Sequence, residues 1–211
     1  MVISELFQIF KGESCVILGN GSSATEYISN EYVKSIGVND IGRIINPDFL
    51  LLADDKDKFL RDSNQERVDM IENTGADYYI CRDTSWNFPV EDYYTFRLGE
   101  MVPKIFNLVN NDKLDFGYDS PYMAILFAVK LGFKNIGILG VDYTPNHFYE
   151  KDGNHSLVKL NLFPKIDAAY NNLNKLHLNI VNLSEQSKIT AFPKMKINDF
   201  YNELTRHNAI Y

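Results

Sequence analysis

The sequence lacks the features that mark several classes of protein. It has only two cysteines, Cys15 and Cys81, and neither belongs to a CxxC pair, so no zinc or redox motif is indicated. No apolar run approaches the roughly 18 residues that a membrane-spanning helix needs. The first residues lack the basic and then apolar regions of a secretion signal. We therefore expect a soluble cytoplasmic protein.

An excess of basic charge is also missing. The chain has 28 acidic and 21 basic residues, which gives a net charge of −7. This charge opposes binding to nucleic acid or to an anionic membrane surface over a broad face, although a local basic pocket remains compatible with it. A length of 211 residues suits one α/β domain with a sizeable core. We predict a single domain that spans residues 1–211.

Short apolar runs alternate with stretches of helical pattern along the chain. Such alternation predicts a mostly parallel sheet. The fold class that we predict is therefore α/β, with a Rossmann-like open sheet flanked by helices. The runs predicted as strands are 14–18, 34–38, 49–53, 78–81, 135–139 and 179–183. The stretches predicted as helices are 23–30, 56–73, 122–131, 165–176 and 196–205.

Two segments interrupt this alternation. Residues 84–119 have the least regular pattern, and we expect an irregular, lid-like insertion that contains a hairpin. Residues 143–164 form a second candidate lid. Between them, Ser120 is the expected N-cap of a helix that has Pro121 at its first position. Gly132 is expected to end that helix at the C′ position.

Polar clusters follow five of the predicted strands. In open α/β sheets, ligands bind outside the carboxyl ends of the strands, so clusters at one edge predict a ligand site. Turns favour the same residue types for conformational reasons, which is the competing explanation. The clusters are Gly19–Ser22, Asn39-Asp40, Asp54-Asp55, Gly140–Asp142 and Ser184.

The first cluster, "GNGSS", is neither a GxGxxG fingerprint nor a Walker loop with its lysine. Gly19 and Gly21 would let backbone N–H groups approach a phosphate. Ser22, Ser23 and the N-terminus of the following helix would add donors and the positive end of the helix dipole. The alternative is a tight turn from strand to helix without a ligand.

Further chemistry is indicated after the fifth strand. The carboxylate of Asp142 could accept from a ribose or sugar hydroxyl, or hold a cation. His147 and His155 follow it, and either could act as a general base because imidazole titrates near neutral pH. Asp54, Asp55 and Asp142 together could hold Mg²⁺ with substrate phosphates, although acidic residues are also ordinary at a helix start.

Several segments taken together resemble a known group. The strings "VILGNGSS", "GVND" and "SPYMAILFAVKLGFKNIGILGVDY", in this order, resemble the Campylobacter-type lipooligosaccharide sialyltransferases. The same skeleton is similar to the MptE-like superfamily, which includes 6-hydroxymethylpterin pyrophosphokinases, and phage-borne proteins carry similar strings. The resemblance covers residues 14–55 and 117–149.

The resemblance implies roles for individual residues. Asp54 stands where the sialyltransferases have Asn, and neither His147 nor His155 stands in the "HY" context of the family's catalytic histidine. Tyr143 and Tyr149 would bind the phosphate. Those transferases need no metal, whereas the pyrophosphokinases use ATP and Mg²⁺. The residues that the resemblance places at the nucleotide are Gly19, Asn20, Gly21, Ser22, Asn39, Asp54, Ser120, Gly140 and Asp142.

Three functions are compatible with these observations. The leading hypothesis is a glycosyltransferase with a CMP-sugar-like donor and a hydroxyl acceptor, without a required cofactor. The alternatives are a pyrophosphokinase-like transferase that uses ATP and Mg²⁺, and a nucleotide-binding module without catalysis. A homo-oligomer is compatible with each of them.

Overall fold

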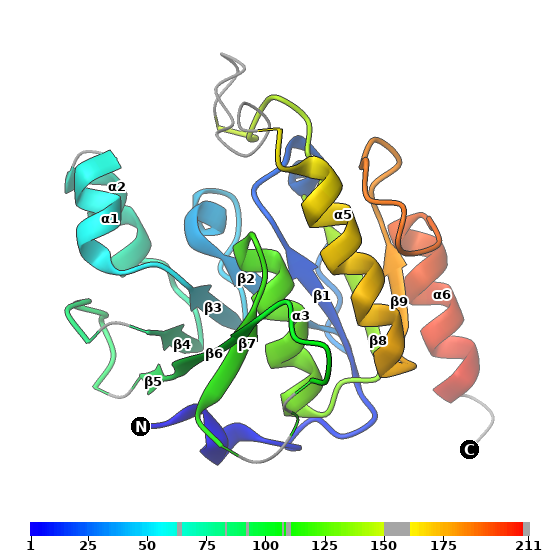
Figure 1. The fold of residues 1–211 in the computed structure, drawn as a ribbon, viewed down its shortest axis with the longest axis horizontal. Helices are drawn as coiled ribbons and strands as arrows, with labels where there is room; N and C mark the ends of the chain where they lie inside the picture. Colours follow the sequence, from blue (N-terminus) through cyan, green and yellow to red (C-terminus); the bar gives the residue numbers. More distant parts are fainter. Residues whose placement is uncertain are drawn as a thin grey trace.

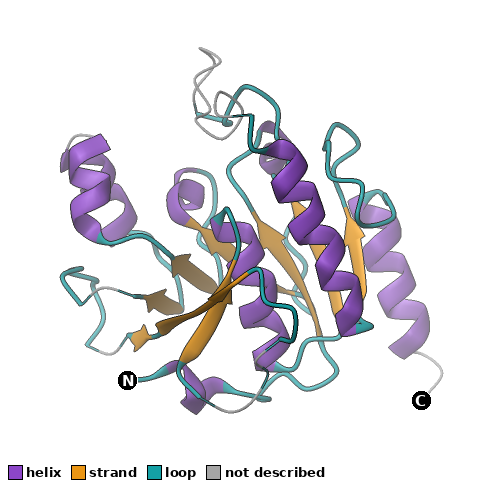
Figure 2. Ribbon diagram, in the orientation of Figure 1, coloured by secondary structure: helices purple, strands orange, loops and turns teal. Residues whose placement is uncertain are grey.

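The computed structural model describes residues 1–149 and 161–208, except 63, 64, 83, 92, 107, 109 and 110. Its centre is a seven-stranded sheet with the order β5-β4-β3-β2-β1-β8-β9, in which every neighbouring pair is parallel (Figures 1 and 2). The α/β, Rossmann-like fold class is therefore confirmed. The strands are β1 Ser14–Leu18, β2 Lys34–Val38, β3 Phe49–Leu52, β4 Tyr78–Cys81, β5 Tyr94–Thr95, β8 Asn135–Leu139 and β9 Asn179–Asn182.

The six apolar runs form the strands expected of them. Parallel strands that are covered on both faces read as continuous apolar runs, and β3 is buried along its whole length. Successive side chains of β1 enter opposite cores: Cys15 and Ile17 join one cluster, and Val16 and Leu18 join the other. The sheet thus has a helical layer on each face.

Four helices form these layers. Figure 1 shows α3 (Ser120–Leu131) and α5 (Phe163–Asn172) on one face of the sheet, where they contribute to one core cluster. Residues of α2 (Gln65–Glu72) and α6 (Ile197–Asn208) contribute to the other cluster. The other helices among the described residues are α1 Lys56–Asp62 and four short 3₁₀ turns, Ile3–Leu6, Ser22–Glu26, Asn39–Arg43 and Leu173–Leu176. Within the described residues, none of the helices has the length and apolar composition needed to cross a bilayer.

The segment 84–119 differs from its prediction. Its first strand, β5, extends the main sheet beside β4. The expected hairpin is wrong, because β6 (Arg97–Met101) and β7 (Lys113–Phe116) pair in parallel and form a separate two-stranded sheet. A parallel pair needs a crossover connection rather than a tight turn, and the chain between β6 and β7 supplies it.

Two helical segments also differ from their predictions. The helix expected over 23–30 is instead a 3₁₀ turn that ends at Glu26. The N-cap of α3 is Asp119 rather than Ser120, since the Asp119 side chain accepts from the Tyr122 N–H at 2.8 Å. Gly132 ends α3 in the left-handed conformation, as expected.

Candidate functional site

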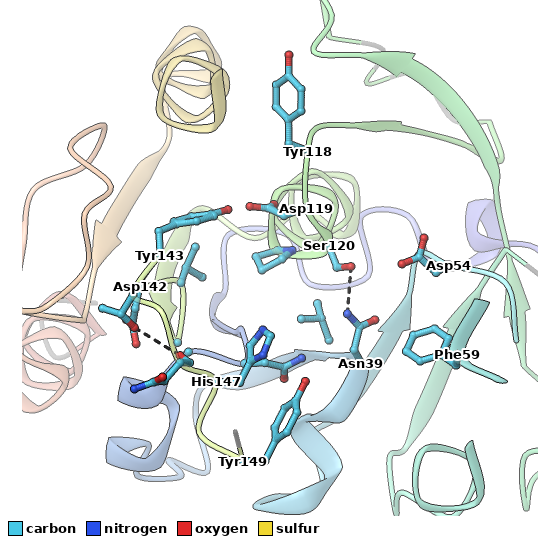
Figure 3. Close-up of a pocket in the computed structure, with 18 of the residues that line it drawn as sticks. Asn39, Asp54, Phe59, Tyr118, Asp119, Ser120, Asp142, Tyr143, His147 and Tyr149 are labelled. Carbon is cyan, nitrogen blue, oxygen red and sulfur yellow. Dashed lines mark hydrogen bonds between the residues drawn. The ribbon is translucent and has the colours of Figure 1, made fainter. Parts of the chain in front are cut away.

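A cavity of about 560 Å³ opens at the carboxyl edge of the sheet (Figure 3). It lies where the strand order reverses, since β1 has β2 on one side and β8 on the other. This volume is within the usual range for small-molecule sites. Most of the predicted site residues line it: Asn20, Gly21, Asn39, Asp54, Ser120, Gly140, Asp142, Tyr143, His147 and Tyr149.

The glycine loop after β1 packs against the loop after β8. The Gly19 N–H donates to the Leu139 carbonyl at 2.8 Å, and the Gly21 N–H donates to the Gly140 carbonyl at 2.7 Å. A Cβ on Gly19 would lie 2.4 Å from the Gly140 carbonyl oxygen, so only glycine permits this approach. The N–H groups of Gly19 and Gly21 themselves are therefore not available to a phosphate, because both are already donated within the protein.

Asp142 holds this arrangement in place. It is 1% exposed, and its carboxylate accepts from the Ser23 N–H at 2.8 Å and from the Ser23 hydroxyl at 2.6 Å. It also accepts from the Ser184 hydroxyl at 2.7 Å and from Gln186 Nε2 at 3.2 Å. A carboxylate offers about four acceptor positions, and four donors occupy them. Asp142 therefore positions the glycine loop and has no acceptor position left for a ribose hydroxyl or a cation.

Two asparagines that line the cavity differ from Asp142, because their side-chain oxygens are unsatisfied within the described residues. The side-chain carbonyl oxygens of Asn20 and Asn39 are buried and accept no hydrogen bond within the described part of the chain. Asn39 also has a φ of 50°, and its Nδ2 donates to the Ser120 hydroxyl at 3.3 Å. An unsatisfied buried carbonyl costs about 1–3 kcal/mol. A ligand that donates hydrogen bonds in this cavity would satisfy both oxygens.

The floor of the cavity is aromatic. The His147 ring stacks on the Tyr149 ring, with centroids 5.1 Å apart and planes at 8°, and the Arg43 guanidinium lies 5.0 Å from the Tyr149 centroid. The Tyr149 hydroxyl donates to Asp40 at 3.2 Å, and Asp40 is also paired with Arg67. The Tyr149 hydroxyl is thus hydrogen-bonded to Asp40, and the Tyr149 ring stacks against the His147 ring.

His147 is also held by its backbone. It forms a β-bridge with Gly21, and the neighbouring Phe148 N–H donates to the backbone carbonyl of Asn20 at 3.0 Å. The segment 143–149 therefore packs on the glycine loop and closes one side of the cavity. His155 and most of the remaining candidate lid lie outside the described residues.

The opposite wall contains cationic residues that the sequence did not indicate. Lys58 lines the cavity and pairs with Asp54 at 2.7 Å, and Arg67 lies over the Phe59 ring with its Cζ 4.8 Å from the centroid. These side chains reach the site only because α1 and α2 pack beside the strand ends. No local pattern distinguishes them from the ordinary polar face of a helix.

The acidic residues do not assemble the alternative magnesium site. Asp54 pairs with Lys58, Asp55 pairs with Arg82, and Asp142 is saturated by four donors. Among the residues described, no three His, Cys, Asp or Glu side chains form a group suited to a metal ion. The donor set that Mg²⁺ prefers is not present there.

Asp119, which the sequence analysis did not select, lines the cavity at the start of α3. It is partly buried, and the Tyr170 hydroxyl donates to its carboxylate at 3.1 and 3.2 Å from the two oxygens. Desolvation raises the pKa of Asp119 to about 6, and the hydrogen bonds from the Tyr122 N–H and from Tyr170 lower it by less. In Figure 3, the Asp119 carboxylate and the Tyr143 hydroxyl point toward one another.

Comparison with known proteins adds information on the fold. No protein-family model and no curated protein matches the chain. The MAf glycosyltransferase from Magnetospirillum magneticum AMB-1 is similar in structure, with a TM-score of 0.61 and 14% identity over 96% of this chain. This chain spans 38% of that longer protein.

The sialyltransferase CstII from Campylobacter jejuni, solved with cytidine-5'-monophosphate, is similar with a TM-score of 0.53 and 14% identity. That match covers 89% of this chain and 86% of the sialyltransferase. A structure of CST-II with a trisaccharide acceptor and CMP gives a TM-score of 0.51 and 14% identity, over 88% of this chain and 87% of that one. At these identities the likeness concerns the fold, which these glycosyltransferases share with this chain.

Proposed function

We propose that this protein transfers a glycosyl group from a nucleotide-sugar donor, of the CMP-sugar kind, to a hydroxyl acceptor. The observation that carries the proposal is a pair of asparagines, Asn20 and Asn39, that line one cavity where the strand order reverses and whose buried side-chain oxygens accept no hydrogen bond within the described residues. Nucleotides offer amino and hydroxyl donors that would satisfy them. The fold that the chain shares with CMP-bound CstII supports the same ligand class.

The nucleotide would lie across the ends of β1, β2 and β8. Asn20, Asn39 and Ser120 would contact it directly, whereas Asp142 and the glycines would hold the loops that shape its site. Tyr143 would stabilise the departing phosphate through its hydroxyl. The cytoplasm, where we expect this protein, would supply the donor.

The binding proposal can be tested by calorimetry with CMP, UDP, GDP and ADP on the full chain. Removing a side chain that makes one uncharged hydrogen bond costs about 1–1.5 kcal/mol, so Asn20→Ala and Asn39→Ala should each weaken CMP binding about tenfold. Asn202→Ala, on the exposed surface of α6, is the matched control and should leave the affinity unchanged. Equal affinities in all four proteins, or no binding of any nucleotide, would refute the proposed site.

Turnover is the second half of the test. Hydrolysis of CMP-, UDP- and GDP-sugars, measured with and without Mg²⁺, should reveal one donor class that the protein cleaves in the absence of metal. Turnover that requires ATP and Mg²⁺ would instead favour a pyrophosphokinase-like reaction. Tight nucleotide binding without any turnover would favour a binding module.

A further inference from the structure

Glycosyl transfer to a hydroxyl requires a group that accepts the hydroxyl proton. The sequence offered His147 and His155 for this role. We propose instead that Asp119 is the general base of this site, a role that rests on the proposed transferase function.

Of the residues that the structure describes, three carboxylates line the cavity, namely Asp54, Asp119 and Asp142. Asp142 is saturated by four protein donors, and Asp54 is ion-paired with Lys58. Asp119 accepts from the Tyr122 N–H on Oδ1 and shares the single Tyr170 hydroxyl proton between both oxygens. Among the described residues these are the two donors to Asp119, and they leave part of the acceptor capacity of Oδ2 unused.

The surroundings of Asp119 keep this carboxylate in one orientation. Tyr170 is 1% exposed on α5, and its ring packs edge-on against Tyr122, with centroids 5.8 Å apart. Tyr143, from the loop after β8, contacts Tyr170 with centroids 6.5 Å apart. Asp119 is therefore enclosed by tyrosines from three elements while it still reaches the cavity.

The charges around Asp119 suit a base that works near neutral pH. In the described part of the chain, the titratable groups that face it are the phenols of Tyr170 on α5, Tyr122 on its own helix and Tyr143 after β8, which are neutral at neutral pH. Within the described ranges, no Lys, Arg or His forms an ion pair with it. Its pKa of about 6 lies close to the operating pH, as an efficient general base requires.

His147 is less suited to the role by its position. Its ring lies flat on Tyr149, and its backbone is bridged to Gly21, so it forms part of the cavity floor. A flat aromatic floor is a surface on which a base or a sugar ring can stack.

The acceptor hydroxyl attacks the anomeric carbon of the donor and forms a new C–O bond, and its proton passes to Asp119 Oδ2. The bond between the anomeric carbon and the phosphate oxygen breaks, and its electron pair leaves with the nucleotide. In donor hydrolysis, water takes the place of the acceptor.

Asp119→Asn is the informative variant because Asn is as good an N-cap as Asp, so α3 keeps its start. With the nucleotide sugar that the wild type hydrolyses, the kcat/KM of the wild type should rise with pH to a plateau above about pH 6. Asp119→Asn should lower kcat by about 10²–10⁴-fold, and its kcat/KM should lack this rise with pH, which is the rising limb of the pH profile. The Kd for CMP should change less than threefold.

Tyr170→Phe and His147→Gln complete the test. Tyr170→Phe removes a hydrogen bond that stabilises the carboxylate, so it should shift the rising limb to higher pH and retain activity. His147→Gln should keep the rising limb, whatever its effect on the rate. The proposal is overturned if Asp119→Asn keeps the limb, or if His147→Gln abolishes it. A wild type that binds no nucleotide and hydrolyses no nucleotide sugar would overturn the transferase function itself, which is a different result.

Discussion

The ionisation of Asp119 predicts a pH-dependent cost to stability that Asp119→Asn removes. In the folded protein, desolvation raises the pKa of this carboxyl from an ordinary 3.8 to about 6. Between these two values the folded state binds more protons than the unfolded state, so the free energy of unfolding falls as pH rises. The cost is absent below about pH 3.8 and complete above about pH 6.

The size of the cost follows from the same two pKa values. One pH unit of difference is worth about 1.4 kcal/mol, so the interval from 3.8 to about 6 corresponds to about 3 kcal/mol. Asp119→Asn keeps an N-cap and an acceptor for Tyr170 but cannot ionise. Relative to wild type, its free energy of unfolding should therefore increase by about 3 kcal/mol between pH 3 and pH 8, and roughly half of that increase falls between pH 5 and pH 8.

Urea unfolding, followed by circular dichroism at pH 5, 6, 7 and 8, measures this difference. Asp199→Asn, an exposed residue in the first turn of α6, removes the same charge away from the cavity and serves as the control. A difference between Asp119→Asn and wild type that stays constant across this range would show that the carboxyl titrates alike in both states. That result would refute the reasoning about desolvation at the cavity.

Three further predictions concern the loops and the asparagines. Asp142→Ala leaves buried donors without an acceptor and should lower the free energy of unfolding by about 3–5 kcal/mol in urea, and a loss below about 1 kcal/mol would contradict its positioning role. Gly140→Ala places a Cβ 2.3 Å from the Gly19 carbonyl oxygen at a φ of +73° and should destabilise more than Gly12→Ala, where φ is +87° but no atom lies within 4 Å. Equal losses would mean that backbone strain alone matters. Asn20→Ala should leave the thermal midpoint unchanged or raise it, because within the described part of the chain its side-chain oxygen has no hydrogen bond to lose, and a fall of more than about 4 °C would argue for a structural role.

The sequence predicted the strands well because a buried parallel strand appears in the sequence as a continuous apolar run. Strands covered on both faces must be apolar throughout, and β1, β2 and β8 begin and end where the runs do. The segment 84–119 was predicted poorly, because the parallel pairing of β6 with β7 accompanies packing of β7 against α3. Neither factor leaves a periodic pattern in the sequence.

The sequence predicted where the site lies in the fold more accurately than which hydrogen bonds its residues make. The edge where the polar clusters converge follows from parallel topology, and ten of the predicted residues line the cavity there. The role of Asp142 was not predictable, since Ser184 and Gln186 reach it from a loop about forty residues away in the chain. Asp119 was overlooked because a Ser-Pro pair is itself a good helix start, and the true N-cap lies one residue earlier.

The degree to which a polar group is satisfied separates its structural and functional roles in this cavity. Asp142 and Tyr149 both line the cavity, but protein partners already hold their polar atoms. The side-chain carbonyl oxygens of Asn20 and Asn39 accept no hydrogen bond from the residues that the structure describes, although burial makes that state unfavourable. Folding alone gains nothing from such oxygens, whereas a bound ligand does. Under the proposed function, nucleotide binding rather than stability accounts for these oxygens, and Asp119 likewise keeps acceptor capacity that the saturated Asp142 lacks.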